Sequence, residues 1–205
     1  MRIIRAADCK VMPWKNGGGT TTEIAVFPEG APLSDFGWRI SMAHVGTDGP
    51  FSSFPGIDRT LSLLTGNGIR LAFEDGETVA LDKGTEPFFF AADRAVDGVL
   101  VDGPIDDLNV MSRRGAWSHK VERLPGGSHE IANERGLLVL VARRGVWQVN
   151  GSALAAGDSA VLPAPATAVA GAGGSPAGRA NSGPPARAEF PGRAQTTPGP
   201  GRAAG

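Results

Sequence analysis

Side chains that could recognise a small acid occur in three short segments. Positions 12–23 read MPWKNGGGTTTE and end at Glu23, positions 36–43 read FGWRISMA, and positions 103–115 read GPIDDLNVMSRRG. The planar fork of an arginine guanidinium matches the two oxygens of a carboxylate. The arginines of the second and third segments are therefore candidate acid-binding residues, although exposed ion pairs use the same residue types.

The glycine-rich segment at 12–23 indicates a special backbone geometry, because three consecutive glycines are unfavourable in a strand. Two interpretations are open. The segment is either a tight loop whose backbone N–H groups face an anion, or a flexible connector between Trp14 and a strand that begins at Glu23. No Gly-Lys-Ser/Thr follows the glycines, and there is no G-x-G-x-x-G between a strand and a helix, so the common nucleotide-binding loops are excluded.

Segment 36–43 alternates as a strand does. Trp38, Ile40 and Met42 share one face, and Arg39 and Ser41 share the other. If the apolar face packs on the core, Arg39 and Ser41 face solvent. If the strand lines a barrel interior, Arg39 is a buried cation that needs an anion. The residues alone favour the solvent-facing arrangement.

The turn-rich segment DGPFSSFPGIDR at 48–59 holds two phenylalanines, which we expect to close one end of a barrel. Asp58 and Arg59 are expected to form an ion pair at the start of the next strand. In the third segment, strand alternation places Asp107 and Asn109 on one face.

Several classes of site are excluded by residue counts. The single Cys9 cannot form an internal disulfide or a Cys-rich zinc site. His44, His119 and His129 are too widely spaced for the usual metal-binding pairs, so we expect no metal and no cofactor. A formal net charge of -1 predicts no nucleic-acid partner.

No segment has the roughly 20 consecutive apolar residues that a transmembrane helix needs. The first residues, MRIIRAADCKVMPWK, lack the apolar core and cleavage site of a secretion signal. We therefore expect a cytoplasmic protein with no membrane partner.

The body of the chain is predicted to be all-β. Short apolar runs alternate with Asp-Gly and Asn-Gly turns, which is typical of an antiparallel sandwich or barrel. The predicted strands cover 59–66, 69–74, 78–81, 87–91, 96–101, 136–142 and 146–149.

A weak internal repeat relates 61–90 to 137–162, because Gly145, Gly151 and Gly157 stand near the places of Gly68, Gly76 and Gly84. Such a repeat predicts two similar β units.

Composition changes near residue 166. From there to residue 205, 26 of 40 residues are Ala, Gly or Pro. A segment of this kind buries too little apolar surface to offset its ordering entropy, which predicts a disordered tail over 166–205. The open alternatives are a basic tail that contacts an anionic partner, and a segment that replaces a final strand and leaves an open sheet edge.

Three blocks of sequence strongly resemble the HutD/Ves family of bacterial proteins: PWKNGGGTTTEIAVFP, FGWRISMAHVGTDGPFSSFPGIDRTLSLLTGNG and DGPIDDLNVMSRRG. The resemblance covers about 2–125 and continues more loosely to about residue 162. It implies a bicupin, with two RmlC-like jelly-roll barrels in 1–165: a first barrel and linker in about 1–125, and part of a second barrel in about 126–165. A homodimer is plausible for this family.

The resemblance also implies a regulator of histidine utilisation that senses an intermediate such as N-formylglutamate. Typical metal-dependent cupins use an H-x-H pair, which is absent from this chain and agrees with a metal-free site.

Two functions are therefore weighed. The preferred one is a non-enzymatic binder of a small carboxylate, with candidate site residues Glu23, Trp38, Arg39, Ser41, Arg59, Asn109 and Arg113. In this hypothesis Trp38 and the phenylalanines near Asp48 form the wall of the pocket, and the three arginines clamp the acid. The alternative is a metal-independent isomerase or hydrolase of a small acid, with Glu23, Asp48 or His44 as proton carriers.

Overall fold

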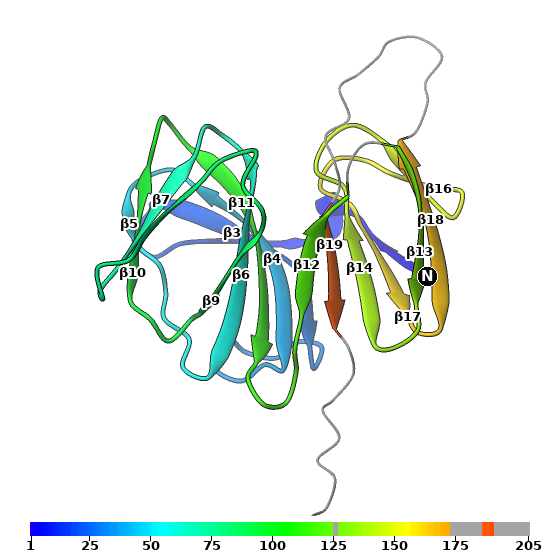
Figure 1. The fold of residues 1–205 in the computed structure, drawn as a ribbon, viewed down its shortest axis with the longest axis horizontal. Helices are drawn as coiled ribbons and strands as arrows, with labels where there is room; N and C mark the ends of the chain where they lie inside the picture. The colour runs from blue at the N-terminus through cyan, green and yellow to red at the C-terminus, as the bar shows by residue number, and fades with distance from the viewer. Residues whose placement is uncertain (125–126, 173–185, 191–205) are drawn as a thin grey trace, which may run out of the picture.

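A computed structural model of the chain describes residues 1–124, 127–172 and 186–190 (Figure 1). Apart from a single 3-10 turn at Ala6–Asp8, its regular elements are strands. They are β1 Arg2–Ile4, β2 Lys10–Pro13, β3 Gly19–Phe27, β4 Trp38–Val45, β5 Gly49–Pro50, β6 Ile57–Thr65, β7 Ile69–Phe73, β8 Thr78–Leu81, β9 Phe88–Ala91, β10 Val96–Leu100, β11 Ile105–Arg113, β12 Lys120–Arg123, β13 Ser128–Asn133, β14 Leu137–Val141, β15 Trp147–Val149, β16 Ser152–Leu154, β17 Ser159–Pro163, β18 Ala166–Ala172 and β19 Ala186–Phe190. All seven strands predicted from the sequence are present, and their ends agree with the prediction or differ from it by one or two residues.

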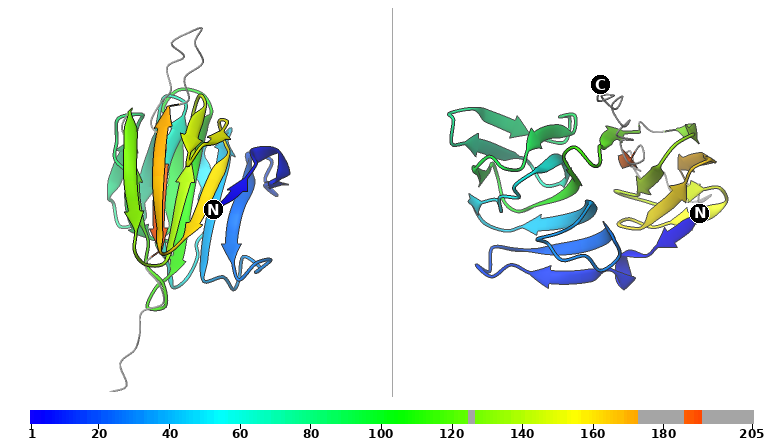
Figure 2. Two further views of the ribbon diagram at one scale, coloured as in Figure 1. Left: turned by 90° about the vertical axis from the view of Figure 1, so that its right-hand side faces the viewer. Right: turned by 90° about the horizontal axis from the view of Figure 1, so that it is seen from below.

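The strands form four antiparallel sheets, arranged as two pairs that lie side by side (Figures 1 and 2). The first pair consists of a six-stranded sheet, β2-β3-β4-β11-β6-β9, and a four-stranded sheet, β5-β10-β7-β8. The second pair consists of a five-stranded sheet, β1-β17-β14-β19-β12, and a four-stranded sheet, β13-β18-β15-β16. Strands β1 and β12 thus belong to the second pair.

The two pairs repeat one pattern of strand pairing. Strand β6 pairs with β9 and β7 with β8 in the first, as β14 pairs with β17 and β15 with β16 in the second. Strands β11 and β10 of the first pair correspond in the same way to β19 and β18 of the second. The weak glycine repeat therefore reflects two units with equivalent topology.

Each pair of sheets encloses its own apolar core, and a third core joins the pairs. Within the first pair, Leu61, Leu63 and Ile69 are buried, and Leu138 and Leu140 are buried within the second. The third core forms where the outer face of the six-stranded sheet packs on the five-stranded sheet. Its buried members are Ile24, Trp38, Ile40, Leu64, Leu108, Val110, Val139, Val141, Val161, Ala188 and Phe190.

The predicted disordered tail is wrong for residues 166–172 and 186–190, which form β18 and β19. Strand β19 pairs with both β14 and β12, so the open edge expected in the second unit is filled. The composition of the segment predicted disorder, but alanines fit in the little space between two neighbouring strands. One large side chain, Phe190, also buries apolar surface. Residues 173–185 and 191–205 of the predicted tail lie outside the described residues.

Replacing Phe190 by Ala tests whether β19 is an integral strand. The Phe190 ring stacks on Trp38 with centroids 4.7 Å apart and is 1% exposed. We expect the free energy of unfolding, measured by urea denaturation, to fall by about 3–5 kcal/mol. Phe89→Ala, at a side chain that is 56% exposed, is the matched control and should cost under about 1 kcal/mol. Equal, small effects of the two substitutions would contradict the placement of β19.

Candidate functional site: a polar cavity in the first sheet pair

The inner face of the six-stranded sheet carries a row of polar side chains across its three central strands. Met111 of β11 lies opposite Arg39 of β4 on one side and opposite Arg59 of β6 on the other. One pleat further along β11, Asn109 lies opposite Ser41. Because side chains alternate between the faces of a sheet, this register brings all five side chains to the same face.

These side chains line a cavity of about 680 Å³ between the inner face and the segments that cross its mouth. This volume lies within the range of small-molecule sites. The lining residues are Met12, Pro13, Trp14, Lys15, Asn16, Thr21, Leu33, Arg39, Ser41, Ala43, Pro50, Phe51, Ser52, Phe54, Arg59, Asn109 and Met111.

Arg59 is buried and held in one orientation. Its Nε donates to Asn109 Oδ1 at 2.8 Å, and its Nη2 donates to the same oxygen. The guanidinium also lies over the Phe51 ring at 4.7 Å and the Phe90 ring at 5.7 Å, where a cation is attracted to the aromatic faces. Burial lowers the pKa of Arg59 to about 10, an effect that Asp107 opposes and Arg39 reinforces. At neutral pH this side chain is therefore still a cation, in a place where charge is costly.

Arg39 is held by a carboxylate at the edge of the cavity. Its Nε donates to Glu23 Oε2 at 2.8 Å, and its Nη1 donates to Ser41 Oγ at 3.1 Å. The Arg39 side chain is 4% exposed, whereas Glu23 is 24% exposed. The buried cation thus has the anion that its position requires.

Asp107 lies next to Asn109 on the same face of β11, and it completes a hydrogen-bonded chain that begins at Arg59. Asn109 Nδ2 donates to Asp107 Oδ1, while Asn109 Oδ1 accepts from Arg59. This is the only amide orientation that satisfies both neighbours, because a guanidinium only donates and a carboxylate accepts. Asp107 is fully buried, and its Oδ2 has no hydrogen-bond partner among the described residues. Burial raises the pKa of Asp107 to about 7, although Arg59 and Asn109 favour the charged form.

The two guanidiniums retain donors for a ligand. Within the described residues, Arg39 Nη2 and Arg59 Nη1 make no hydrogen bond. Both arginines line the cavity, and Met111 lies between them on the sheet. An anion above Met111 would therefore meet N–H donors from two sides, while Phe51, Phe54 and Leu33 offer apolar contacts to the rest of the molecule.

Five of the seven predicted site residues come together in this cavity or at its edge: Glu23, Arg39, Ser41, Arg59 and Asn109. The solvent-facing arrangement favoured for Arg39 and Ser41 is wrong, since they are 3% and 1% exposed. Alternation is consistent with either arrangement. The sheet is covered on both faces, so the apolar face of β4 packs on the second sheet pair while the polar face lines the cavity.

The other two predicted site residues lie elsewhere. Trp38 points to the outer face and stacks on Phe190, so it does not line the cavity. Arg113 donates from Nε to Phe36 O at 3.0 Å and pairs with Asp35 at 3.2 Å, beyond the end of the cavity. An arginine at the end of a strand reaches the connecting loops rather than the centre of the sheet.

The sequence interpretation missed Asp107 and the segment that closes the cavity mouth. Alternation along the strand already placed Asp107 on the same face as Asn109. The sequence did not indicate that Asp107 is buried. The glycines of segment 12–23 were singled out, but Trp14, Lys15 and Asn16 were not named as site residues, because their place depends on how β2 folds back on β3.

The glycine-rich segment is a tight hairpin turn, which contradicts the flexible connector. Trp14 N donates to Gly19 O at 2.9 Å, and Gly17 has a positive φ of 72°. A Cβ on Gly19 would lie 2.2 Å from His44 O, so a side chain is excluded where β3 meets β4. Gly18 N donates to the Asn16 side chain at 3.0 Å, so this N–H is used within the turn.

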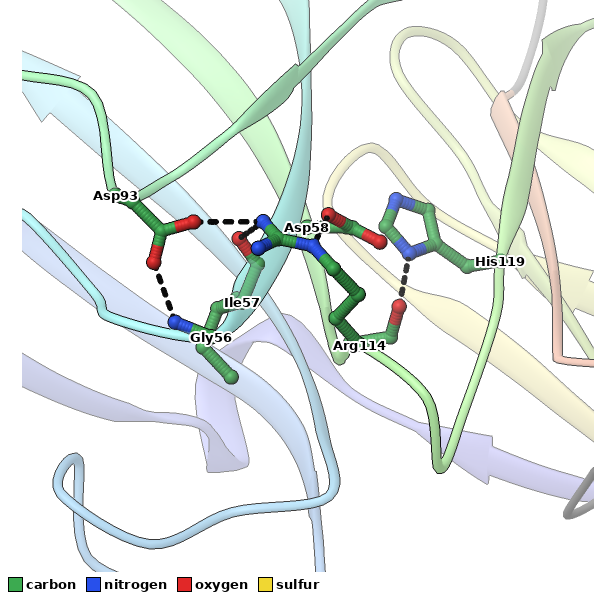
Figure 3. A network of polar contacts seen from close by, with 7 residues as sticks. Gly56, Ile57, Asp58, Asp93, Arg114 and His119 are labelled. Atoms are coloured by element: carbon green, nitrogen blue, oxygen red, sulfur yellow. Dashed lines mark hydrogen bonds and ion pairs between the residues drawn. The ribbon is translucent and has the colours of Figure 1, made fainter.

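The aromatic wall of the cavity is fixed by a network around Arg114, and the ion pair expected between Asp58 and Arg59 is wrong. Arg114 pairs with Asp58 at 2.8 Å and with Asp93 at 2.7 Å (Figure 3). Gly56 N donates to Asp93, and Arg114 N donates to Gly56 O at 2.9 Å. Because Asp58 and Arg59 are successive residues of β6, they point to opposite faces. The network holds the loop that carries Phe51 and Phe54 across the cavity.

Each proton carrier considered for an enzyme is engaged by a different partner. His44 pairs with Asp106 at 2.8 Å and is 52% exposed, Asp48 accepts from Leu100 N at 2.8 Å, and Glu23 is engaged by Arg39.

Among the described residues, no three His, Cys, Asp or Glu side chains are grouped so that they could hold a metal ion. The described part of the chain also contains no helix that is long and apolar enough to cross a membrane.

The family model HutD matches residues 6–176. The chain belongs to the HutD family. Protein Ves of Citrobacter koseri is 38% identical over 157 residues, which are 75% of this chain and 80% of that protein. An uncharacterized 21.2 kDa protein in the hutC 3' region of Pseudomonas putida is 33% identical over 69% of this chain and 74% of its own length.

Solved structures extend this likeness to the whole HutD fold. HutD from Pseudomonas fluorescens SBW25 has a TM-score of 0.80 and 28% identity, covering 94% of this chain and 98% of that one. YhhW from Escherichia coli, a cupin-like neighbour, has a TM-score of 0.63 at 10% identity over 93% of this chain and 97% of its own, a likeness of fold alone.

Asp107→Asn tests the buried carboxyl through the pH dependence of stability. The pKa of Asp107 in the folded state, about 7, lies above its ordinary value of 3.8, so the folded protein binds the proton more tightly than the unfolded chain. The contribution of this group to stability is therefore present below about pH 4 and is lost as the pH rises to about 7. The substitution should remove this decline. The change that it causes in the free energy of unfolding should therefore be more favourable at pH 8 than at pH 4, by on the order of 1–3 kcal/mol.

The measurement is urea denaturation between pH 4 and pH 8. Asp97→Asn, which removes an exposed carboxyl from β10, is the control and should keep the decline. The assignment fails if Asp107→Asn and the wild type have parallel profiles.

Proposed function

We propose that this HutD family member binds a small carboxylate in the cavity of its first sheet pair. The observation that carries the proposal is the pair of buried arginines, Arg39 and Arg59, which line one cavity and keep unused N–H donors. A cation taken out of water is costly unless an anion accompanies it. Glu23 accompanies Arg39, whereas Arg59 contacts no carboxylate directly among the described residues. A bound carboxylate would supply an anion for Arg59, and each charge-assisted hydrogen bond contributes about 1.5–3 kcal/mol.

The orientation of Arg59 supports a preorganised site. Asn109 occupies one edge of the guanidinium, and the Phe51 and Phe90 rings lie against it, so its remaining donors can point in few directions. Little rotamer entropy is then lost on binding, which is an advantage for a sensor of a small metabolite.

Family membership and the hutC neighbourhood of the Pseudomonas putida relative connect the proposal to histidine utilisation. We propose that the protein is a cytoplasmic regulator of that pathway, and that its ligand is an acidic intermediate such as N-formylglutamate. Two guanidiniums at neighbouring positions suit a ligand with carboxylate groups, and the apolar wall suits its methylene chain.

The same proposal includes the bicupin architecture. Strands β4 to β11 and β12 to β19 are two sets of eight that pair in the same order, which is the number of strands in a jelly-roll barrel. The cavity belongs to the first set, whereas the second set fills its interior with side chains such as Leu138, Leu140 and Trp147. On this proposal the first barrel is the ligand-binding unit and the second supports it.

Arg59→Gln is the direct test of the clamp. It keeps the approximate size of the side chain but removes the charge, so we expect affinity for N-formylglutamate to fall roughly 10- to 150-fold. Arg113→Gln is the matched control, because Arg113 lies outside the cavity, and should bind as the wild type does. Binding is measured by thermal-shift titration, in which a ligand at one hundred times its Kd adds about 2.7 kcal/mol of stability.

Urocanate, glutamate and histidine are titrated in parallel to define the ligand. A stabilising effect that is unchanged in Arg59→Gln would place the ligand outside this cavity and refute the clamp. NMR observation of each mixture over hours separates binding from turnover, and formation of a product would favour the isomerase or hydrolase alternative.

A further inference from the structure

Two arginines of the second sheet pair reach across the junction to the end of β6. Arg123 closes β12, and Arg143 follows β14. The Nη2 of Arg123 donates to Leu63 O at 3.2 Å, and the Nη2 of Arg143 donates to the same oxygen at 2.9 Å and to Leu64 O at 2.8 Å. Two cations therefore share one neutral acceptor.

The carbonyls that they bind are open because of how β6 is paired. Strand β9 pairs with β6 only as far as Leu61, and within the described ranges no other strand pairs with the following residues on that edge. On the other edge, a register shift between Asp106 and Asp107 makes Leu64 an extra residue. Backbone carbonyls that a bulge leaves without a strand partner need hydrogen-bond donors. This need explains why the arginines bind these carbonyls, but it does not explain why their positive charge is not balanced by a carboxylate.

The electrostatic environment of the two arginines is unfavourable. Neither forms an ion pair with a carboxylate among the described residues, and the Nε of each is buried without a hydrogen-bond partner. Burial lowers the pKa of Arg143 to about 10, and the charges of Arg123 and Arg144 lower it further. Burial also lowers the pKa of Arg123, an effect opposed by Glu86 and Asp82, which make no hydrogen bond to it.

The residues outside the described ranges add no acidic side chain to this cluster. Residues 125–126, 173–185 and 191–205 contain no aspartate or glutamate. Arg123 Nη1 also donates to the carbonyl oxygen of Lys83 at 2.6 Å, which is another neutral acceptor. With Asp82 and Glu86 counted, Arg123, Arg143 and Arg144 leave a net charge of +1.

We propose that Arg123, Arg143 and Arg144 form a second anion-binding site, at the junction of the two sheet pairs, that takes a phosphate group. A phosphate group would bring the three guanidiniums the negative charge that no carboxylate among the described residues supplies to Arg123 and Arg143 by direct contact. Guanidiniums that come from three backbone positions also suit an anion with oxygens on several sides better than a planar carboxylate. This site is separate from the carboxylate cavity, because none of its residues lines that cavity. An anion here would bridge the two sheet pairs.

The test is a ³¹P NMR titration of the full chain with inorganic phosphate at constant ionic strength and pH 7.5. Arg144→Gln is the principal variant, because Arg144 makes no hydrogen bond to the described residues and its replacement leaves the carbonyl contacts intact. We expect the phosphate affinity to fall at least about fivefold. Arg143→Gln should weaken binding as well, whereas Arg70→Gln, an exposed arginine on β7, should not.

Other results of the titration would overturn the proposal or distinguish between the two sources of phosphate. The proposal is overturned if the wild type does not bind phosphate at millimolar concentration, or if Arg144→Gln and Arg70→Gln bind it equally. It is also overturned if Arg59→Gln abolishes phosphate binding while Arg144→Gln does not, since phosphate would then occupy the cavity. Glycerol 1-phosphate is titrated in parallel: tighter binding than inorganic phosphate indicates a phosphorylated metabolite, and weaker binding indicates the free ion. Both results require the same arginines.

Discussion

The six-stranded sheet is covered on both faces. Its strands must therefore place apolar side chains on the face that packs on the second sheet pair and polar side chains on the face that lines the cavity. Strand β4 shows this most clearly, because Trp38 and Ile40 pack against the second sheet pair while Arg39 and Ser41 face the cavity. A one-residue slip of β4 would put Arg39 and Ser41 into the apolar junction and Trp38 and Ile40 into the polar cavity. The junction therefore fixes the register of the strands that build the candidate site. Packing between the two sheet pairs thus determines which side chains line the cavity.

Burial of positive charge is the energetic consequence of this arrangement. Inside the cavity the protein supplies Glu23 for Arg39, and for Arg59 it supplies Asp107 through Asn109. The compensation is incomplete, because Asp107 keeps one oxygen without a partner and its pKa rises to about 7. Incompletely balanced charge is common where a protein binds a charged ligand, since a fully satisfied network would leave the ligand nothing to contribute.

The junction shows the same imbalance in a simpler form. There, Arg123 and Arg143 are committed to the carbonyls of Leu63 and Leu64, and their positive charges accumulate without a carboxylate in contact. The bulge that opens these carbonyls is also the place where β11 changes register, between Asp106 and the buried Asp107. A ligand that acts on the junction would thus be only a few residues along β6 and β11 from the carboxylate cavity, which gives the two sites a physical connection through rigid strands.

The amino-acid sequence by itself determined the class of fold, because turn residues between short apolar runs leave few alternatives to antiparallel sheets. It also indicated the repeat, the family and most of the polar site residues, since alternation in a strand is a local property that places Arg39 with Ser41 and Asp107 with Asn109. Only the tertiary structure decided which face of each strand is buried and against what. That choice turned Trp38 away from the cavity, left Arg113 beyond its end and brought Arg39 inside. It also made strands of 166–172 and 186–190, whose alanines carry little apolar surface of their own and are ordered by the neighbours with which they pair. The physical reason is the same in each case: periodicity along a strand is local, whereas burial and ion pairing depend on residues that lie far apart in the chain.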